Sequence, residues 1–251
     1  MIKIGLKLWS TNTSFHTEIL ELYEKGYFSY IELFAVPESK KIVREFWKKI
    51  DIPYIIHAAH SMTGLNFSKK EMRNRNFVLA DEAKYFADEL KADKIIFHPG
   101  IDGELEETIR QINLIKDSRF LIENKPAVGL NGEKCIGSTI REIQEIINEC
   151  GCRFCLDFGH AIAAANTYKI EPLQYCKDFM HLKPVMFHLT DGDYTSEKDH
   201  HFHYGLGTFP LTEIFELIPE ASFVTNEAKR DSQDSLKEII RDTEYSKSFF
   251  I

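Results

Sequence analysis

Six apolar segments of this chain each run into a histidine or a carboxylate. They read IPYIIHAAH (52–60), KIIFHPG (94–100), RFLIENKP (119–126), RFCLDFGH (153–160), VMFHLTDG (185–192) and SFVTNEAK (222–229). Each is rich in β-branched or aromatic residues, which is typical of a buried strand. The side chains at their ends are His57, His98, Glu123, Asp157, His188 and Glu227. Imidazole and carboxylate together suit zinc, manganese, iron or cobalt, whereas calcium prefers oxygen ligands alone.

The neighbouring segments predict where these ends lie. Two more strand-like segments, 2–10 and 28–36, precede the six. Helical patterns alternate with all the strands, at 16–26, 39–50, 68–90, 105–116, 138–150, 172–182, 210–218 and 234–245. Such alternation implies parallel strands with right-handed crossovers. The sequence shows no linker or low-complexity tract, so we predict one α/β domain over residues 1–251, a single (β/α)8 TIM barrel.

A barrel of this kind brings the carboxyl ends of all its strands to one face, where active sites are built. One histidine at a strand end is more often a structural residue. Six successive strands that end in ligand types favour a shared metal pocket instead. The segment 192–210 is the most polar of the connections, and long loops on this face are usually functional.

Two local signals predict helix ends. Gly26 follows the first helical pattern and is expected to cap its carboxyl end. Ser68 and Glu71 have the spacing of a capping box, so we expect the third helix to begin at Ser68.

Composition limits the partners. Hydrophobic residues are 43% and charged residues 28% of the chain, and no apolar run reaches the length of a membrane span. The amino terminus lacks the pattern of a signal peptide, so we expect a cytosolic, cytoplasmic protein without a membrane partner. The net charge of −8 argues against a nucleic-acid partner, although bound divalent ions would offset most of it. We interpret the CGCRFC cluster (150–155) as reduced cysteines around a strand, because no paired zinc motif accompanies it.

Several of these motifs carry a family resemblance. FHPG, LIEN, LDFGHAIAAA, HLTD and the Asp199-x-His201 pair before GLG resemble the xylose isomerase-like TIM barrels, also called AP endonuclease family 2. That superfamily includes sugar isomerases, ketose epimerases and endonuclease IV. LDFGHAIAAA is similar to the D-x-x-H-A-x-A-A element of endonuclease IV.

The resemblance to endonuclease IV implies a phosphoesterase with up to three zinc ions, possessing the activity of cleaving DNA at abasic sites. The first ion would take His57, His98 and Glu123, and the third would take His160, Asp199 and His201. The second would take Glu123, Asp157, His188 and Glu227. Glu123, Asp157 and Glu227 would be the catalytic carboxylates, with Glu123 or Asp157 orienting the attacking water.

The resemblance to the sugar isomerases and epimerases implies a different reaction. There one metal, held by Glu123, Asp157, His188 and Glu227, serves an enediolate mechanism in which the two glutamates exchange protons with the sugar or sugar phosphate. The epimerase pattern usually places an arginine after the seventh strand, and this chain has none between His188 and Gly207.

The chain also departs from endonuclease IV where that family reads DNA. His60 and Ser61 stand where a DNA-inserting tyrosine–leucine pair is expected, and Leu206 replaces the glutamate of the G-E-G element. Lys125-Pro126 replaces an alanine–glycine pair. DNA therefore stays one of two substrate classes, beside a small phosphate ester or sugar phosphate.

Other residues near the strand ends are candidates for substrate contact. Lys125 and Lys229 are candidates for holding a phosphate or carboxylate, with solvated surface lysines as the alternative. His60 and His203 are candidates for substrate contacts or for hydrogen bonds to the metal ligands. Glu32, inside the second strand, either reaches the pocket rim or pairs with a neighbouring lysine.

Overall fold

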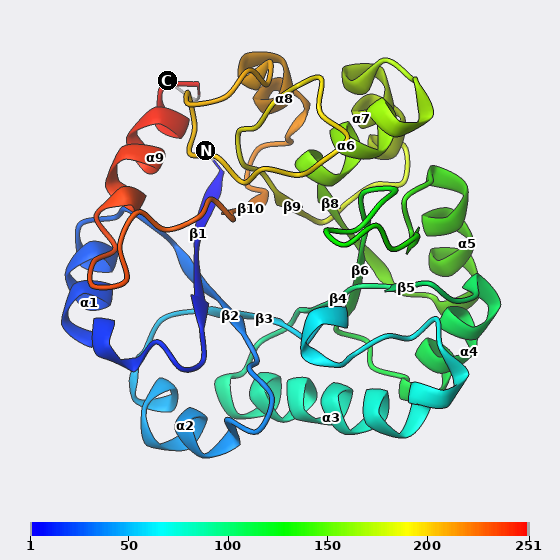
Figure 1. Cartoon of the computed structure of the whole chain (residues 1–251). Helices are drawn as coiled ribbons and strands as arrows, with labels where there is room; N and C mark the ends of the chain where they lie inside the picture. The colour runs from blue at the N-terminus through cyan, green and yellow to red at the C-terminus, as the bar shows by residue number, and fades with distance from the viewer. Residues whose placement is uncertain (1, 250–251) are drawn as a thin grey trace.

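Parallel strands close into an eight-stranded barrel in the computed structural model, which describes residues 2–249 (Figure 1). The strands are β1 (Lys3–Trp9), β2 (Tyr30–Phe34), β3 (Tyr54–His57), β4 (Ile95–Phe97), β6 (Phe120–Glu123), β8 (Arg153–Asp157), β9 (Met186–His188) and β10 (Phe223–Asn226). Their order around the barrel follows the chain, and β10 pairs with β1 to close it. The predicted (β/α)8 barrel is confirmed.

Helices surround the barrel on its outer side (Figure 1). They are α1 (His16–Glu24), α2 (Lys40–Glu45), α3 (Arg73–Leu90), α4 (Leu105–Ile115), α5 (Ile140–Cys150), α6 (Phe158–Tyr168), α7 (Pro172–Met180), α8 (Leu211–Leu217) and α9 (Glu238–Lys247). A small antiparallel pair, β5 (Gly100–Ile101) with β7 (Cys135–Ile136), joins the segments that follow β4 and β6. Gly26 has φ +73°, so it takes the left-handed conformation expected beyond the end of α1.

The predicted capping box at Ser68 is wrong. α3 begins at Arg73, after a 3-10 turn over Lys70–Met72. The Ser68 hydroxyl instead bonds to the side chain of Asn66 and the carbonyl of Ile101, so it does not cap a helix.

A second difference lies directly after β8. The helical patterns expected from the sequence include none between 150 and 172, but α6 starts at Phe158. Asp157, the last residue of β8, is its N-cap, and its Oδ1 accepts a hydrogen bond from the backbone N–H of His160 at 2.8 Å. The last ligand-type residue of the strand therefore also starts the helix that carries His160.

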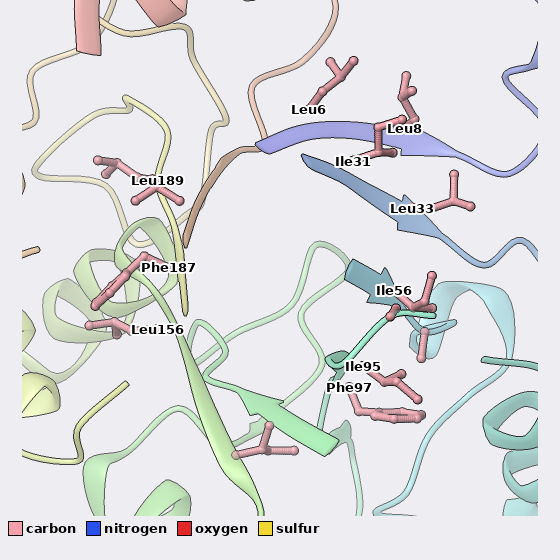
Figure 2. Packing of buried hydrophobic residues seen from close by; sticks show 14 of the residues in the cluster. Leu6, Leu8, Ile31, Leu33, Ile56, Ile95, Phe97, Leu156, Phe187 and Leu189 are labelled. Carbon is pink, nitrogen blue, oxygen red and sulfur yellow. The ribbon is translucent and has the colours of Figure 1, made fainter. Parts of the chain in front are cut away.

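The core lies mainly between the barrel and its helices. Alternate strand residues point outward into it, as Figure 2 shows for Leu6 and Leu8 of β1 and for Ile31 and Leu33 of β2. Phe97, Leu156 and Phe187 extend the same layer in other strands (Figure 2). Because these side chains face outward, their neighbours along each strand must face the barrel interior.

The interior holds a smaller apolar layer. It consists of Tyr30, Ile55, Ile96, Leu121, Cys155 and Met186. The Tyr30 ring fits because Gly5 faces it: a Cβ on Gly5 would lie 2.4 Å from the ring. The Tyr30 hydroxyl bonds to the hydroxyl of Thr225 at 2.8 Å. This layer supports whatever lies above it toward the carboxyl ends of the strands.

Candidate metal centre

Above the apolar layer the barrel interior becomes polar. Moving two residues toward the carboxyl end from each member of that layer gives Glu32, His57, His98, Glu123, Asp157 and His188. β1 adds Lys7, whose ammonium contacts Glu32 and Glu227, and Glu227 follows the end of β10. Because inward side chains recur every second residue, all eight strands contribute to one polar ring. The six residues predicted from the strand ends lie in it.

The first ligand group of the ring joins three neighbouring strands. Glu123 Oε2 lies 3.3 Å from His57 Nε2 and 3.1 Å from His98 Nε2. One donor atom from each of the three residues lies within 4.8 Å of the others. Glu123 is completely buried, so its carboxylate needs such partners.

The second group joins β8, β9 and the end of β10, which are neighbours in the barrel. His188 Nδ1 is 3.2 Å from Glu227 Oε1 and 3.9 Å from Asp157 Oδ2. It is also 3.4 Å from Glu123 Oε1. Since the two oxygens of Glu123 face different histidines, this carboxylate lies between the first and second groups.

The third group stands outside the ring of strands. His160 lies on α6, and Asp199 and His201 lie in the connection between β9 and α8. Asp199 Oδ2 is 3.4 Å from His160 Nε2 and 2.6 Å from His201 Nε2. His201 has φ +54°, a left-handed conformation that costs a non-glycine residue about 1 kcal/mol. This loop therefore takes a strained shape at the point where it presents a ligand-type side chain.

Backbone hydrogen bonds select which ring nitrogen each histidine presents. The Nδ1 atoms of His57, His160 and His201 lie 2.8–3.0 Å from the carbonyl oxygens of Ala58, Asn124 and Glu227, respectively. A carbonyl only accepts, so each Nδ1 carries a proton and donates it. The Nε2 atoms therefore face the carboxylates, and they are the nitrogens that would bind a metal once any proton they carry has been lost.

His188 presents its other ring nitrogen, Nδ1, to the ligand groups. Its Nε2 lies 2.9 Å from Glu32 Oε2, so Nε2–H donates to this carboxylate and Nδ1 faces the second group. His188 Nδ1, Glu123 Oε1 and Asp199 Oδ1 are buried atoms without a hydrogen-bond partner. Buried polar atoms rarely lack partners, and these three belong to the second and third groups. The donor set and its unpartnered atoms thus fit bound divalent cations.

The ring concentrates negative charge in a buried space. Burial raises the pKa of Asp157 to about 6, and the charges of Asp199 and Glu123 add to this against the attraction of His160. Although burial opposes it, contact with Asp199 raises the pKa of His201 to about 9. Such perturbed groups are typical of sites that bind cations or move protons.

Asp191 holds the loop that carries the third group. Its buried carboxylate accepts four backbone N–H groups at 2.8–3.0 Å, from Gly192, Gly205, Gly207 and Phe209. A Cβ on Gly207 would lie 2.3 Å from the Gly192 carbonyl oxygen, so the GLG element needs glycine for this close approach. The HLTD and GLG motifs therefore act together to place Asp199 and His201.

Asn124 links two of the ligand-bearing strands. It is completely buried, and its side chain donates to the Asp157 carbonyl at 2.9 Å and accepts from the Asp157 N–H at 2.7 Å. Its own carbonyl accepts from His160 Nδ1. The LIEN motif thus supplies one ligand-type residue, Glu123, and one residue that orients two others.

Sequence reasoning missed Lys7 and left the role of Glu32 open. Glu32 is completely buried and pairs with Lys7, as one of its two expected roles required. Lys7 lies in the middle of a strand, and a lysine in that position is usually interpreted as a solvent-exposed side chain. Its position two residues beyond the interior-facing Gly5, and its register opposite Glu32, are the signals that could have found it.

The four predicted substrate-contact residues have different surroundings in the structure. The His60 ring stacks on His98, with ring centroids 5.7 Å apart, and its Nδ1 accepts from Met62 N–H. Burial lowers the pKa of His98, and the charge of Lys125, two residues after Glu123, lowers this pKa further. His203 has both ring nitrogens bonded, to Asp242 at 2.6 Å and to Asp231 at 3.1 Å. Lys229 donates its backbone N–H to the His201 carbonyl.

The five cysteines are free, and Cys155 lies in the apolar layer inside the barrel. Within residues 2–249, none of the helices is both long enough and apolar enough to cross a membrane.

Comparisons with known proteins agree with the fold. A family model described as xylose isomerase-like TIM barrel matches residues 20–248. A probable endonuclease 4 from Thermoplasma volcanium is 31% identical over 118 residues, which span 44% of this chain and 40% of that relative. The match thus covers less than half the length of that protein.

Two solved structures resemble the whole chain. A D-tagatose 3-epimerase-like protein superposes with a TM-score of 0.75 at 18% identity, covering 99% of this chain and 97% of that chain. Endonuclease IV from Thermus thermophilus gives a TM-score of 0.73 at 18% identity, with 99% and 98% covered. At this identity the likeness shows the fold alone, and it does not distinguish the two chemistries.

Proposed function

Because this chain belongs to the xylose isomerase-like TIM barrel family, which is a family of enzymes, we propose that it is a divalent-metal-dependent phosphoesterase of the endonuclease IV type. The metal we propose is zinc, since the donors are imidazole and carboxylate and the first and third groups are rich in histidine. The same donors also suit manganese.

Hydrolysis is supported by the first and third ligand groups, because they add residues to the set that both reactions would use. Proton transfer at a sugar carbon needs one metal and the set Glu123, Asp157, His188 and Glu227. The remaining five residues, His57, His98, His160, Asp199 and His201, would then have no purpose as ligands. Instead they complete two groups whose donor atoms lie within 4.8 Å of one another. The tautomers of three of them, His57, His160 and His201, are also fixed by backbone carbonyls, as is typical of metal ligands.

Clustered divalent ions, when bound, neutralise phosphate oxygens, supply a nucleophile at neutral pH and stabilise the leaving oxygen. The chain's own residues prepare this site. Glu123 directs one oxygen to the first group and the other to the second. Asp157 uses Oδ1 to accept the His160 N–H, so Oδ2 is left toward the pocket to orient an attacking water. To Lys125, whose charge acts on His98 and His160, we assign the binding of a further anionic group of the substrate.

The second candidate is a metal-dependent isomerase or epimerase of sugars or sugar phosphates. It is favoured by the compact set around His188, whose Nδ1 lies 3.2–3.9 Å from oxygens of Glu123, Asp157 and Glu227. That set alone would serve an enediolate mechanism, with Glu123 and Glu227 as the proton-transferring groups.

The two candidates are separated by one side-by-side assay. We expect zinc-loaded protein to cleave either an oligonucleotide with one abasic site or small phosphodiesters such as bis(4-nitrophenyl) phosphate, and to leave a panel of ketoses unchanged. An intact oligonucleotide with cleavage of the small diester would assign a small phosphate ester as the substrate class. Epimerised ketose with both phosphate substrates intact would overturn the proposal in favour of the second candidate.

A further inference from the structure

A fourth group of ligand-type residues occupies the β1 side of the ring. Glu32 on β2, His57 on β3 and Glu227 after β10 present donor atoms within 4.8 Å of one another. This group differs from the three described above, because Glu32 belongs to none of them. Two carboxylates so close inside a barrel need a cation nearby.

The chain supplies that cation itself. The Lys7 ammonium contacts Glu32 Oε1 and Glu227 Oε1 together. Lys7 and Glu32 are paired residues of adjacent strands, so this contact is fixed by the barrel register. The Lys7 side chain is 18% exposed and Glu32 is fully buried, so solvent and salt screen this ion pair less than they screen a surface pair.

The same ion pair extends to the second ligand group. Glu32 uses its other oxygen, Oε2, to accept the Nε2–H of His188 at 2.9 Å. Glu227 Oε1 lies between the Lys7 ammonium and His188 Nδ1, which is 3.2 Å away. Lys7 thus contacts Glu227, a member of the second group, directly, and it orients His188 through Glu32.

We propose that Lys7 is a permanent cation of the centre. Its ammonium pairs with the two carboxylates of the group formed by Glu32, His57 and Glu227, and so excludes a divalent ion from this side of the ring. By engaging Glu32 it also positions His188, with Nδ1 toward the second group. Lys7 and Glu32 are therefore positioning residues, and a lysine here limits the number of ions that the ring accepts.

The test is a count of bound ions after removal of the cation. The Lys7→Met variant, close in size and without charge, is equilibrated with the wild type against the same buffered zinc solutions. Zinc per chain is then measured by inductively coupled plasma mass spectrometry. We expect Lys7→Met to bind one ion more than the wild type at saturation. Lys7→Arg, which keeps the charge, should match the wild-type count.

A double variant assigns the added ion to its ligands. Lys7→Met with Glu32→Gln removes one carboxylate of the proposed position, so the count should return to the wild-type value. Equal counts for the wild type and folded Lys7→Met at every zinc concentration would overturn the proposal. An extra ion that persists in the double variant would do the same, because it would be bound elsewhere.

If Lys7→Met does not fold, the Glu32→Gln variant tests the positioning role instead. Glu32→Gln keeps the shape of the side chain but weakens its hold on Lys7 and His188. We expect the zinc affinity of the second group to fall by about 10-fold or more, as for other hydrogen-bond partners of metal-bound histidines. Unchanged affinity would contradict the positioning role. Both readouts compare variants with the wild type, so they hold whether or not the protein hydrolyses phosphate esters.

Discussion

Replacing Asp191 by asparagine should separate the third ligand group from the other two. Asp191 belongs to none of the ligand groups, but its carboxylate accepts the N–H groups of Gly192 and Phe209 on Oδ1 and those of Gly205 and Gly207 on Oδ2. Asparagine keeps the size of the side chain. Its amide nitrogen, however, would face N–H donors at one of the two positions.

The cost follows from the hydrogen bonds that change. A hydrogen bond to an ionised acceptor contributes about 1.5 kcal/mol or more, and a neutral one contributes about 1 kcal/mol. The substitution removes two charge-assisted bonds and makes the other two neutral, a loss of about 4 kcal/mol. Since about 1.4 kcal/mol corresponds to a factor of ten, the ordered loop would be disfavoured nearly 1000-fold.

The loss should appear as a missing metal ion. The loop carries Asp199 and His201, whereas the first and second groups lie on strands or at their ends. We expect Asp191→Asn to bind one zinc ion fewer than the wild type, to lose phosphoesterase activity and to keep the circular dichroism spectrum of the barrel. Asp193→Asn is the matched control, because the Asp193 carboxylate is exposed and, within residues 2–249, bonds only to Thr195 of its own turn. Full zinc content and activity in Asp191→Asn would refute this account of the loop.

Three further outcomes are expected. His201→Ala should abolish phosphoesterase activity, measured as release of 4-nitrophenol. His200→Ala should keep it, because among the described residues the His200 ring bonds only to Ser196 and lies outside the ligand groups. Equal activities of the two variants would remove His201 from the third group. Because the pKa of His201 is raised to about 9, its ion pair with Asp199 stabilises the metal-free protein at neutral pH and is lost as the pH rises through about 9. Zinc must therefore displace this proton when it binds. Calorimetry of zinc binding at pH 7, in buffers of different ionisation enthalpy, should show a proton release that fades above pH 9. A binding enthalpy that does not depend on the buffer would contradict this proton displacement. Gly5→Ala should lower the free energy of unfolding in urea by about 1–3 kcal/mol, because the new Cβ would meet the Tyr30 ring at 2.4 Å. An unchanged urea midpoint would show that the apolar layer inside the barrel can shift.

The fold and the strand-end residues could be predicted because they depend on local patterns. A parallel barrel turns a repeated strand–helix rhythm into one shared face, so a row of ligand-type residues in the sequence becomes a ring in space. His98 and His188 were predicted from their positions at strand ends, and the structure brings both of them close to Glu123.

The features that sequence reasoning missed depend on contacts between distant segments. α6 was not expected because its residues from Phe158 to Ala165 are all buried, and a helix buried on every side has no amphipathic pattern. Asp191 accepts from N–H groups up to Phe209, which no local motif predicts. Lys7 depends on the register of β1 with β2. Each of these follows from tertiary packing and not from the composition of its own segment.

The number and position of bound ions test the central claim most directly. Zinc content measured by mass spectrometry, together with anomalous diffraction from zinc-loaded crystals, gives both at once. We predict three ions in the wild type: one at His57, His98 and Glu123, one at Asp157, His188 and Glu227 beside Glu123, and one at His160, Asp199 and His201. A single ion, bound only by Glu123, Asp157, His188 and Glu227, would contradict the hydrolase account and favour the isomerase.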